Sequence, residues 1–204
     1  LNYSNISAKL SRITPHKWMN IIHDINPSRN IGFSHTDISI HRLYKLLLSK
    51  CKHIWSEMLK LKVEVDGVNM GLIDILSVVP HSNKIIASIK YHTQFNFHDL
   101  MNYNNWSPLS NAARYGTFDT FRYILDHSSF SDICSSPYSE GKHETHSLMS
   151  LTLMNSDSRL FDYLLDSPNI NNYLDTISSE DIHDIVENLW NYQKNDSKHF
   201  SFIK

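Results

Sequence analysis

The sequence is poor in the residues that make tight turns and covalent cross-links. Five glycines and six prolines among 204 residues argue against an all-β fold, because such a fold uses these residues at most of its hairpins. The two cysteines, Cys51 and Cys134, are too few for a disulfide framework and lie far apart, which favours a reducing compartment. A single Cys51–Cys134 bridge is the remaining alternative.

The chain also lacks an excess of charge and a long apolar run. Its formal net charge is −2, so the composition gives no electrostatic basis for binding nucleic acid or an anionic membrane. The four lysines of Lys50–Lys62 are interrupted by Glu57 and suit a solvated face. No apolar run approaches about 18 residues, which is the length that predicts a membrane span. Hydrophobic residues make up 41% of the chain, as in a globular domain or two small ones.

No targeting segment is evident either, because no basic and then apolar stretch opens the chain. Together with the few cysteines, this predicts an intracellular and cytoplasmic protein. The chain opens with Leu1 rather than methionine, so a fragment of a longer protein, with its signal lost, stays open as an alternative.

Motifs of catalysis and of metal binding are absent as well. The sequence has no Gly-x-Ser-x-Gly, no glycine-rich phosphate loop and no kinase motifs, and its acidic residues are spread singly. His143 and His146 are three residues apart and do not form the metalloprotease pattern, and no Cys/His pair has zinc-finger spacing. We therefore expect no catalytic residue, no cofactor, no metal and no small-molecule substrate.

The stretch NWSPLSNAARYGTFDTFRYILDH (105–127) predicts two short antiparallel helices. Ser107 is a good N-cap, and proline is favoured at the first helical position after it. Small side chains at Ala112 and Ala113 allow a second helix to approach closely. Gly116 can adopt the left-handed conformation that ends a helix. An apolar face then recurs at helical spacing, formed by Phe118, Phe121, Ile124 and Leu125. A generic helical hairpin within a bundle is the alternative.

The residues SPLSNAARYGTFDTFRYIL resemble the ankyrin repeat, whose motif runs Thr-Pro-Leu-His, then Ala-Ala, then Gly, then a second helix rich in Val and Leu. Ser107 stands for the threonine and Ser110 for the histidine, and the remaining motif positions match at Pro108, Leu109, Ala112, Ala113 and Gly116. Ser110 is a departure, because the family's histidine ties neighbouring loops together. The resemblance implies an all-α fold, an ankyrin-like stack of antiparallel helix pairs (an α-solenoid).

A single repeat cannot bury its own apolar faces, so neighbouring units are expected. Residues 147–171 align with the clear unit (105–128) at an offset of 40 residues, where the family period is about 33. Ser129–His146 takes up the excess as an extended loop. Residues 71–92 predict another degenerate helix pair, and Gln94–Asn105 links it to the clear unit.

Both ends of the chain differ from these units. Residues 178–190 predict a further helix, with a capping box between Ser178 and Asp181. This helix is either half of another repeat or a cap. At the other end, His16–Ile25 predicts one helix, and Thr36–Lys62 predicts one long amphipathic helix or two helices broken near Ser49. We therefore divide the chain into an atypical helical N-terminal region (1–65, a cap or decayed repeats) and ankyrin-like repeats (66–204).

The resemblance further implies a non-catalytic adaptor that binds a protein partner through the concave face of the stack. Tryptophan, tyrosine and arginine are the residue types that anchor interfaces. On the clear unit this face would carry Asn104, Asn105 and Trp106 at a loop tip, and Asn111, Arg114 and Tyr115 on the first helix. In the alternative reading, Trp106 covers the edge of the stack and Tyr115 packs on the next repeat.

The sequence does not identify the partner. Two other functions stay open: the recognition part of a larger enzyme or of a ubiquitin-ligase-type protein, and a small helical enzyme.

Overall fold

A computed structural model describes residues 12–24, 48–65, 68–100, 107–129, 133, 138–139, 145–168 and 170–195. This part of the chain is mostly helical. The helices are α2 (Pro15–Asp24), η2 (Lys52–Ile54), α4 (Trp55–Met58), α5 (Leu72–Ser77), α6 (Asn83–Thr93), η3 (His98–Leu100), α7 (Pro108–Tyr115), α8 (Phe118–Asp126), α10 (Leu148–Leu153), α11 (Arg159–Leu165), α12 (Ile170–Leu174) and α13 (Ser179–Asn195). None of these helices is long and apolar enough to span a membrane.

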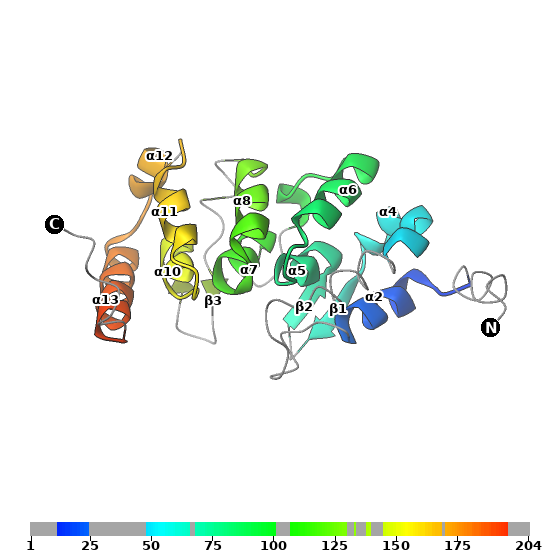
Figure 1. The fold of residues 1–204 in the computed structure, drawn as a ribbon, viewed down its shortest axis with the longest axis horizontal. Helices are drawn as coiled ribbons and strands as arrows, with labels where there is room; N and C mark the ends of the chain where they lie inside the picture. The colour runs from blue at the N-terminus through cyan, green and yellow to red at the C-terminus, as the bar shows by residue number, and fades with distance from the viewer. Residues whose placement is uncertain are drawn as a thin grey trace.

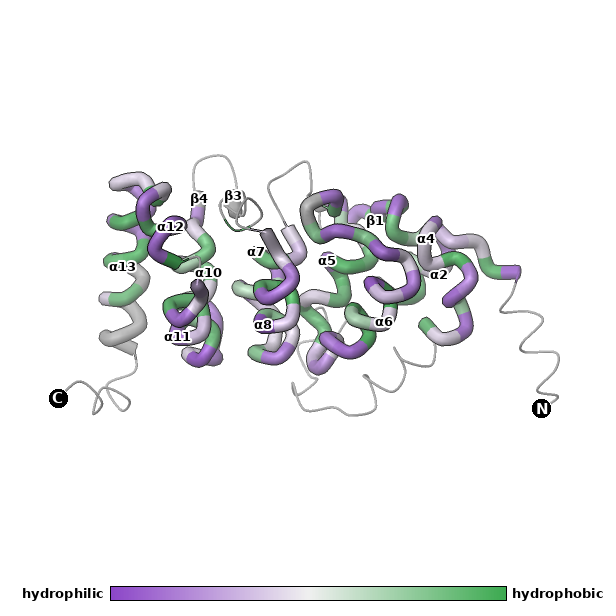
Figure 2. Tube along the Cα trace, turned by 90° about the horizontal axis from the view of Figure 1, so that it is seen from above, coloured by the Kyte–Doolittle hydropathy of each residue, from purple (hydrophilic) through white to green (hydrophobic). Residues whose placement is uncertain are grey.

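The helices α5 to α11 form three pairs that stand side by side along the long axis of the molecule (Figure 1). The first helix of each pair contacts the first helix of the next, so α5, α7 and α10 form one row, which we call the inner row. The second helices, α6, α8 and α11, contact one another in the same order and form the outer row. Helix α13 packs on α10 and continues the inner row (Figure 2).

The four helices of the inner row begin with one or both halves of a capping box. In α7, α10 and α13 the serine before the helix accepts the N–H three residues later through its hydroxyl oxygen, and in α5 and α13 the N–H before the helix donates to an aspartate three residues later. The four pairs are Gly71 with Asp74, Ser107 with Ser110, Ser147 with Ser150 and Ser178 with Asp181. The expected capping box at Ser178 is thus confirmed, and one half of it recurs at each of the other three helices.

The predicted helix pairs are confirmed in all three units. The alanines behave as expected, because Ala112 and Ala113 are both fully buried where α7 packs between α5 and α10. The role expected for Gly116 is wrong: its φ of −80° and ψ of 173° are extended rather than left-handed. A Cβ atom at this position would lie 2.6 Å from the Ala112 carbonyl oxygen and 2.7 Å from that of Ser77. Glycine is needed here for close approach of α7 to the end of α5.

The N-terminal region is only partly as expected. The helix expected near His16–Ile25 is confirmed as α2, which packs on α4 and α5. The expectation of a helix through Lys62 is wrong, because strand β1 (Lys62–Val65) pairs with β2 (Val68–Gly71) in an antiparallel hairpin. The sequence KVEV alternates in polarity and carries β-branched valines, which suits a half-buried strand. Residues 36–47 lie outside the described part of the chain.

Two hairpins bear on the expected organisation of the chain. The predicted division between residues 65 and 66 falls between two strands that pair with each other. A second hairpin, β3 (Tyr138–Ser139) with β4 (Thr145–His146), lies within the segment expected to be an extended loop. Cys51 is a buried, unbridged thiol whose pKa burial raises to about 11, and Cys134 lies outside the described residues.

Candidate functional site

Three of the six residues predicted to bind a partner, Asn111, Arg114 and Tyr115, fall in the described part of the chain. Asn104, Asn105 and Trp106 lie outside the described residues. Asn111 is only 1% exposed and faces the interior of the stack. The last turn of α7 is more open, since Tyr115 is 42% exposed and the Arg114 guanidinium carbon lies 5.2 Å from the centre of its ring. Of the predicted set, the described structure therefore brings only Arg114 and Tyr115 together near the surface.

In α5, α7 and α10 the inner row offers little other exposed surface, whereas α13 at its end exposes Ile182, Val186 and Trp190. Every residue of α5 and of α10 is buried, as are the first six residues of α7. Exposed side chains lie instead in the short turns that join inner to outer helices, at His81, Tyr115, Ser156 and Ser158. We call the row of turns at 78–82, 115–117 and 154–158 the turn edge.

Two hydrogen-bonded side chains join α7 to α10 at this edge. The Asn155 amide nitrogen donates to the carbonyl oxygens of Ala113 (3.0 Å) and Gly116 (3.1 Å). These carbonyls lie at the end of α7, where helical carbonyls lack partners within the helix. Arg114 Nη1 donates to the Met154 carbonyl oxygen at 2.7 Å, where α10 ends. Each unit therefore donates hydrogen bonds to the helix end of its neighbour. Arg114 thus helps to hold the two units together, in addition to lying near Tyr115.

The contact between α5 and α7 is different, because several of its buried polar atoms make no hydrogen bond of good geometry, although the Asn111 amide lies close enough to Asp74 to lower the pKa of its carboxyl. Asp74 is 2% exposed, and its Oδ2 atom accepts the Gly71 N–H at 2.8 Å. Within the described residues, Asp74 Oδ1 and both polar atoms of the Asn111 side chain have no hydrogen-bond partner. Each buried polar atom left in this state costs about 1–3 kcal/mol. The α5–α7 contact thus retains unused hydrogen-bonding capacity.

Burial has a large effect on the Asp74 carboxyl group. Removal from water raises its pKa from 3.8 to about 7. The Gly71 N–H, the Lys62 charge and the Asn111 amide oppose this rise only in part. Asp74 therefore changes its charge near neutral pH, where a surface aspartate would be ionised.

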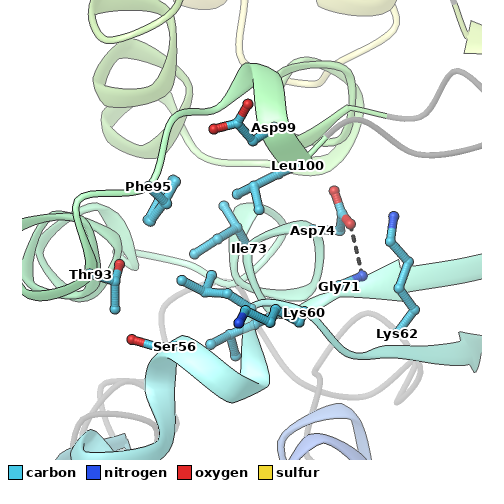
Figure 3. A pocket seen from close by; sticks show the side chains of 12 residues that line it. Ser56, Lys60, Lys62, Gly71, Ile73, Asp74, Thr93, Phe95, Asp99 and Leu100 are labelled. Atoms are coloured by element: carbon cyan, nitrogen blue, oxygen red, sulfur yellow. Dashed lines mark hydrogen bonds between the residues drawn. The ribbon is translucent and has the colours of Figure 1, made fainter.

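A cavity of about 520 Å³ opens beside Asp74, bounded by α4, the β1–β2 hairpin, α5 and the segment after α6. Its apolar wall includes Ile73, Phe95 and Leu100. Its polar lining residues are Ser56, Lys60, Lys62, Asp74, Thr93 and Asp99. Figure 3 shows the Asp74 carboxylate and the Lys62 ammonium side by side at one end, with Ser56 and Thr93 toward the other. We call this space the Asp74 cavity.

An aromatic cluster on the outer row completes the set of unusual surface features. The Phe118 ring of α8 stands edge-on to Tyr163 of α11 at 5.6 Å, and the Arg159 guanidinium carbon lies 4.8 Å from its centre. Arg159 is also paired with Asp157 at 2.6 Å, and the Tyr163 hydroxyl donates to Asp126 at 2.8 Å. The charged and polar groups of this cluster are paired with one another, so we interpret the cluster as a packing contact that holds α8 against α11.

No group of three metal-ligating side chains occurs within the described part of the chain. No protein family, curated protein or solved structure matches this sequence or its fold. The resemblance to ankyrin repeats therefore depends on the residues of the clear unit.

Sequence reasoning missed both Asp74 and Asn155. Asp74 carried a usable signal, because it is the one carboxylate in the apolar run GLIDILSVV (71–79), where a charged residue needs a partner or a function. Asn155 carried no such signal, since its two acceptors lie 42 and 39 residues away along the chain.

Proposed function

We propose that the chain is a non-catalytic protein-interaction module, built as an ankyrin-like stack, which binds a protein partner at the turn edge around Tyr115. The observation that supports this most is the repeated inner row, in which four helices pack in succession and three of them, α7, α10 and α13, start with a serine hydroxyl that accepts the N–H three residues later. Stacked repeats of this kind usually serve as extended binding surfaces.

The chemistry of the turn edge suits protein recognition. Tyr115 combines an exposed aromatic ring with a neighbouring guanidinium group, and tyrosine and arginine are enriched among residues that dominate binding energy. The bonds of Asn155 and Arg114 across the α7–α10 contact hold the backbone under Tyr115 in place. A surface held in this way loses little conformational entropy on binding. The buried, unbridged Cys51 suits an intracellular location for such a module.

Affinity capture from cell lysate, quantified by mass spectrometry, tests this proposal with two matched variants. Tyr115→Ala should deplete the captured partner about tenfold or more, as expected for loss of an anchor residue. Tyr91→Ala is the control, because Tyr91 is 75% exposed on α6 and lies away from the turn edge. Thermal unfolding of both variants should match the parent. A partner retained equally by Tyr115→Ala and Tyr91→Ala would contradict the proposal.

A further inference from the structure

Helix α13 carries an apolar stripe that the described part of the structure leaves uncovered. Ile182, Val186 and Trp190 are 53%, 57% and 68% exposed. Residues four apart lie along one side of a helix, so these side chains form a continuous row, which we call the α13 stripe. It lies next to the face through which Ile185 and Leu189 pack on the core. Contiguous exposed apolar side chains of this kind mark an interaction surface.

The position of α13 in the stack accounts for this exposure. Helices α7 and α10 each contact an inner-row helix on both sides and the outer-row helix of their own unit, whereas the main contacts of α13 are with α10 and β4. In Figures 1 and 2, α13 stands at one end of the row of described helices. The last unit of a repeat stack normally has a polar outer face, so an apolar stripe on α13 favours packing by a further element.

The spacing of the α13 stripe suits a second copy of the same helix. Val186 is four residues from Ile182 and four residues from Trp190. When two α13 helices lie antiparallel with Val186 opposite Val186, Ile182 of each copy meets Trp190 of the other. The large indole rings then lie beside smaller side chains, and both copies use the same patch. A two-fold interface requires a patch that is complementary to itself in this way.

The charges along α13 favour the same antiparallel arrangement. Its acidic residues all lie between Glu180 and Glu187, and its only lysine, Lys194, comes in the last turn. A parallel pair would place the acidic halves of the two helices side by side, where like charges repel. An antiparallel pair places the acidic half of each helix beside the half of the other that has no acidic residue. Charge therefore selects the orientation in which the stripe is complementary to itself.

We propose that the α13 stripe is a two-fold contact between two copies of this chain, with the α13 helices antiparallel and Val186 at the axis. An interface built around one helix is small, below about 1,200 Å², so the dimer forms reversibly, with a dissociation constant in the micromolar range or weaker. The contact does not involve Tyr115. It is therefore independent of partner capture at the turn edge, and a dimer presents that edge twice.

Sedimentation equilibrium of the full chain, from about 1 μM to about 1 mM, tests this dimer. We expect a monomer–dimer equilibrium for the parent and a Trp190→Gln variant that stays monomeric over the same range. Tyr91→Gln is the matched control, because Tyr91 is 75% exposed on α6, and it should dimerise as the parent does. A parent that stays monomeric, because another segment or a different protein covers the stripe, would overturn the proposal. Oligomers larger than a dimer would do the same, since a closed two-fold contact excludes them.

Val186 allows a more specific test, because a residue on the two-fold axis meets its own copy. Val186→Glu and Val186→Lys each place like charges opposite one another, so each variant alone should lose about tenfold or more in dimer affinity. An equimolar mixture pairs the introduced carboxylate with the introduced ammonium group and should restore association as a heterodimer. Failure to associate on mixing, with both variants folded by circular dichroism, would refute the two-fold arrangement. If either variant does not fold, the comparison of Trp190→Gln with Tyr91→Gln decides.

Discussion

Helix α7 packs between α5 and α10, and its two contacts differ in polar chemistry. Toward α10, Asn155 and Arg114 donate to three carbonyl oxygens at helix ends, and only Arg114 Nε lacks a hydrogen-bond partner among the described residues of this contact. Toward α5, Asp74 and Asn111 are buried, and three of their polar atoms have no hydrogen-bond partner among the described residues. Small residues allow close packing in both directions, so packing alone does not decide how a contact is completed.

This difference shows that the contacts within one stack need not be equally stabilised by their polar groups. A satisfied polar contact stabilises a unique arrangement, whereas an unsatisfied one costs stability. The α7–α10 contact therefore stabilises the arrangement of its two helices, whereas the α5–α7 contact, next to the Asp74 cavity, keeps buried polar atoms without hydrogen bonds of good geometry. Substitutions in each contact test this difference.

The largest effect is expected from Gly116→Ala. The added Cβ would lie 2.6 and 2.7 Å from two backbone oxygens, of Ala112 and Ser77, and backbone atoms cannot move aside as a flexible side chain can. We expect a loss of about 3 kcal/mol or more in the free energy of unfolding, measured by urea denaturation. Gly71→Ala is the control, because its nearest atom is a side-chain oxygen of Asp74 at 3.2 Å. Equal stability of the two variants would show that α5 and α7 do not meet this closely.

The contrast between the two contacts is tested by the same substitution in each. Asn155→Leu removes three hydrogen bonds: two that its amide nitrogen donates to carbonyl oxygens at the end of α7, and one that its oxygen accepts from the Asp157 N–H. It should lower the free energy of unfolding by about 2–3 kcal/mol. Asn111→Leu removes an amide that makes no hydrogen bond of good geometry among the described residues and that lowers the pKa of Asp74 only in part, so its effect should stay within about 1 kcal/mol.

Urea denaturation of both leucine variants decides between these outcomes. A loss for Asn111→Leu as large as that for Asn155→Leu would mean that the Asn111 amide is paired in solution. The distinction between the two contacts would then fail.

The pH dependence caused by Asp74 is expected to be a smaller effect than the loss for Gly116→Ala. Its folded-state pKa is raised to about 7 from 3.8, so between about pH 4 and pH 7 the folded chain holds a proton that the unfolded chain has released. Stability therefore falls as the pH rises through this window. Asp74→Asn cannot titrate, so its free energy of unfolding relative to the parent should increase by about 2 kcal/mol between pH 5 and pH 7. A constant difference at both pH values would show that Asp74 titrates as a normal surface aspartate.

Much of the fold could be predicted because its signals are local. The Ser107–Pro108 start, the paired alanines and the apolar spacing after Gly116 are each read from a few consecutive residues, and α7 and α8 follow them closely. The same holds for α13, where Ser178 and Asp181 form the expected cap. The strand at Lys62–Val65 was missed because four residues that alternate in polarity also fit the end of an amphipathic helix.

The candidate sites were less predictable. Tyr115 was expected at the surface and is there, but Asn111 was expected beside it and is buried. In a stack, part of each helix is covered by a neighbouring helix and part faces solvent. The sequence of the helix does not show which residues are covered and which are exposed. The Asp74 cavity brings together residues from 56 to 100, and no local pattern marks such a meeting.

The sequence by itself determined where helices begin, which side chains are apolar and which residues are small enough for close packing, because these properties depend on neighbours within one or two turns. Only the tertiary structure decided which polar groups meet across the stack: Asn155 with the end of α7, and Asp74 with Lys62 beside a cavity. Hydrogen bonds and burial act over a few ångströms in space, and folding brings residues that are tens of positions apart within that range.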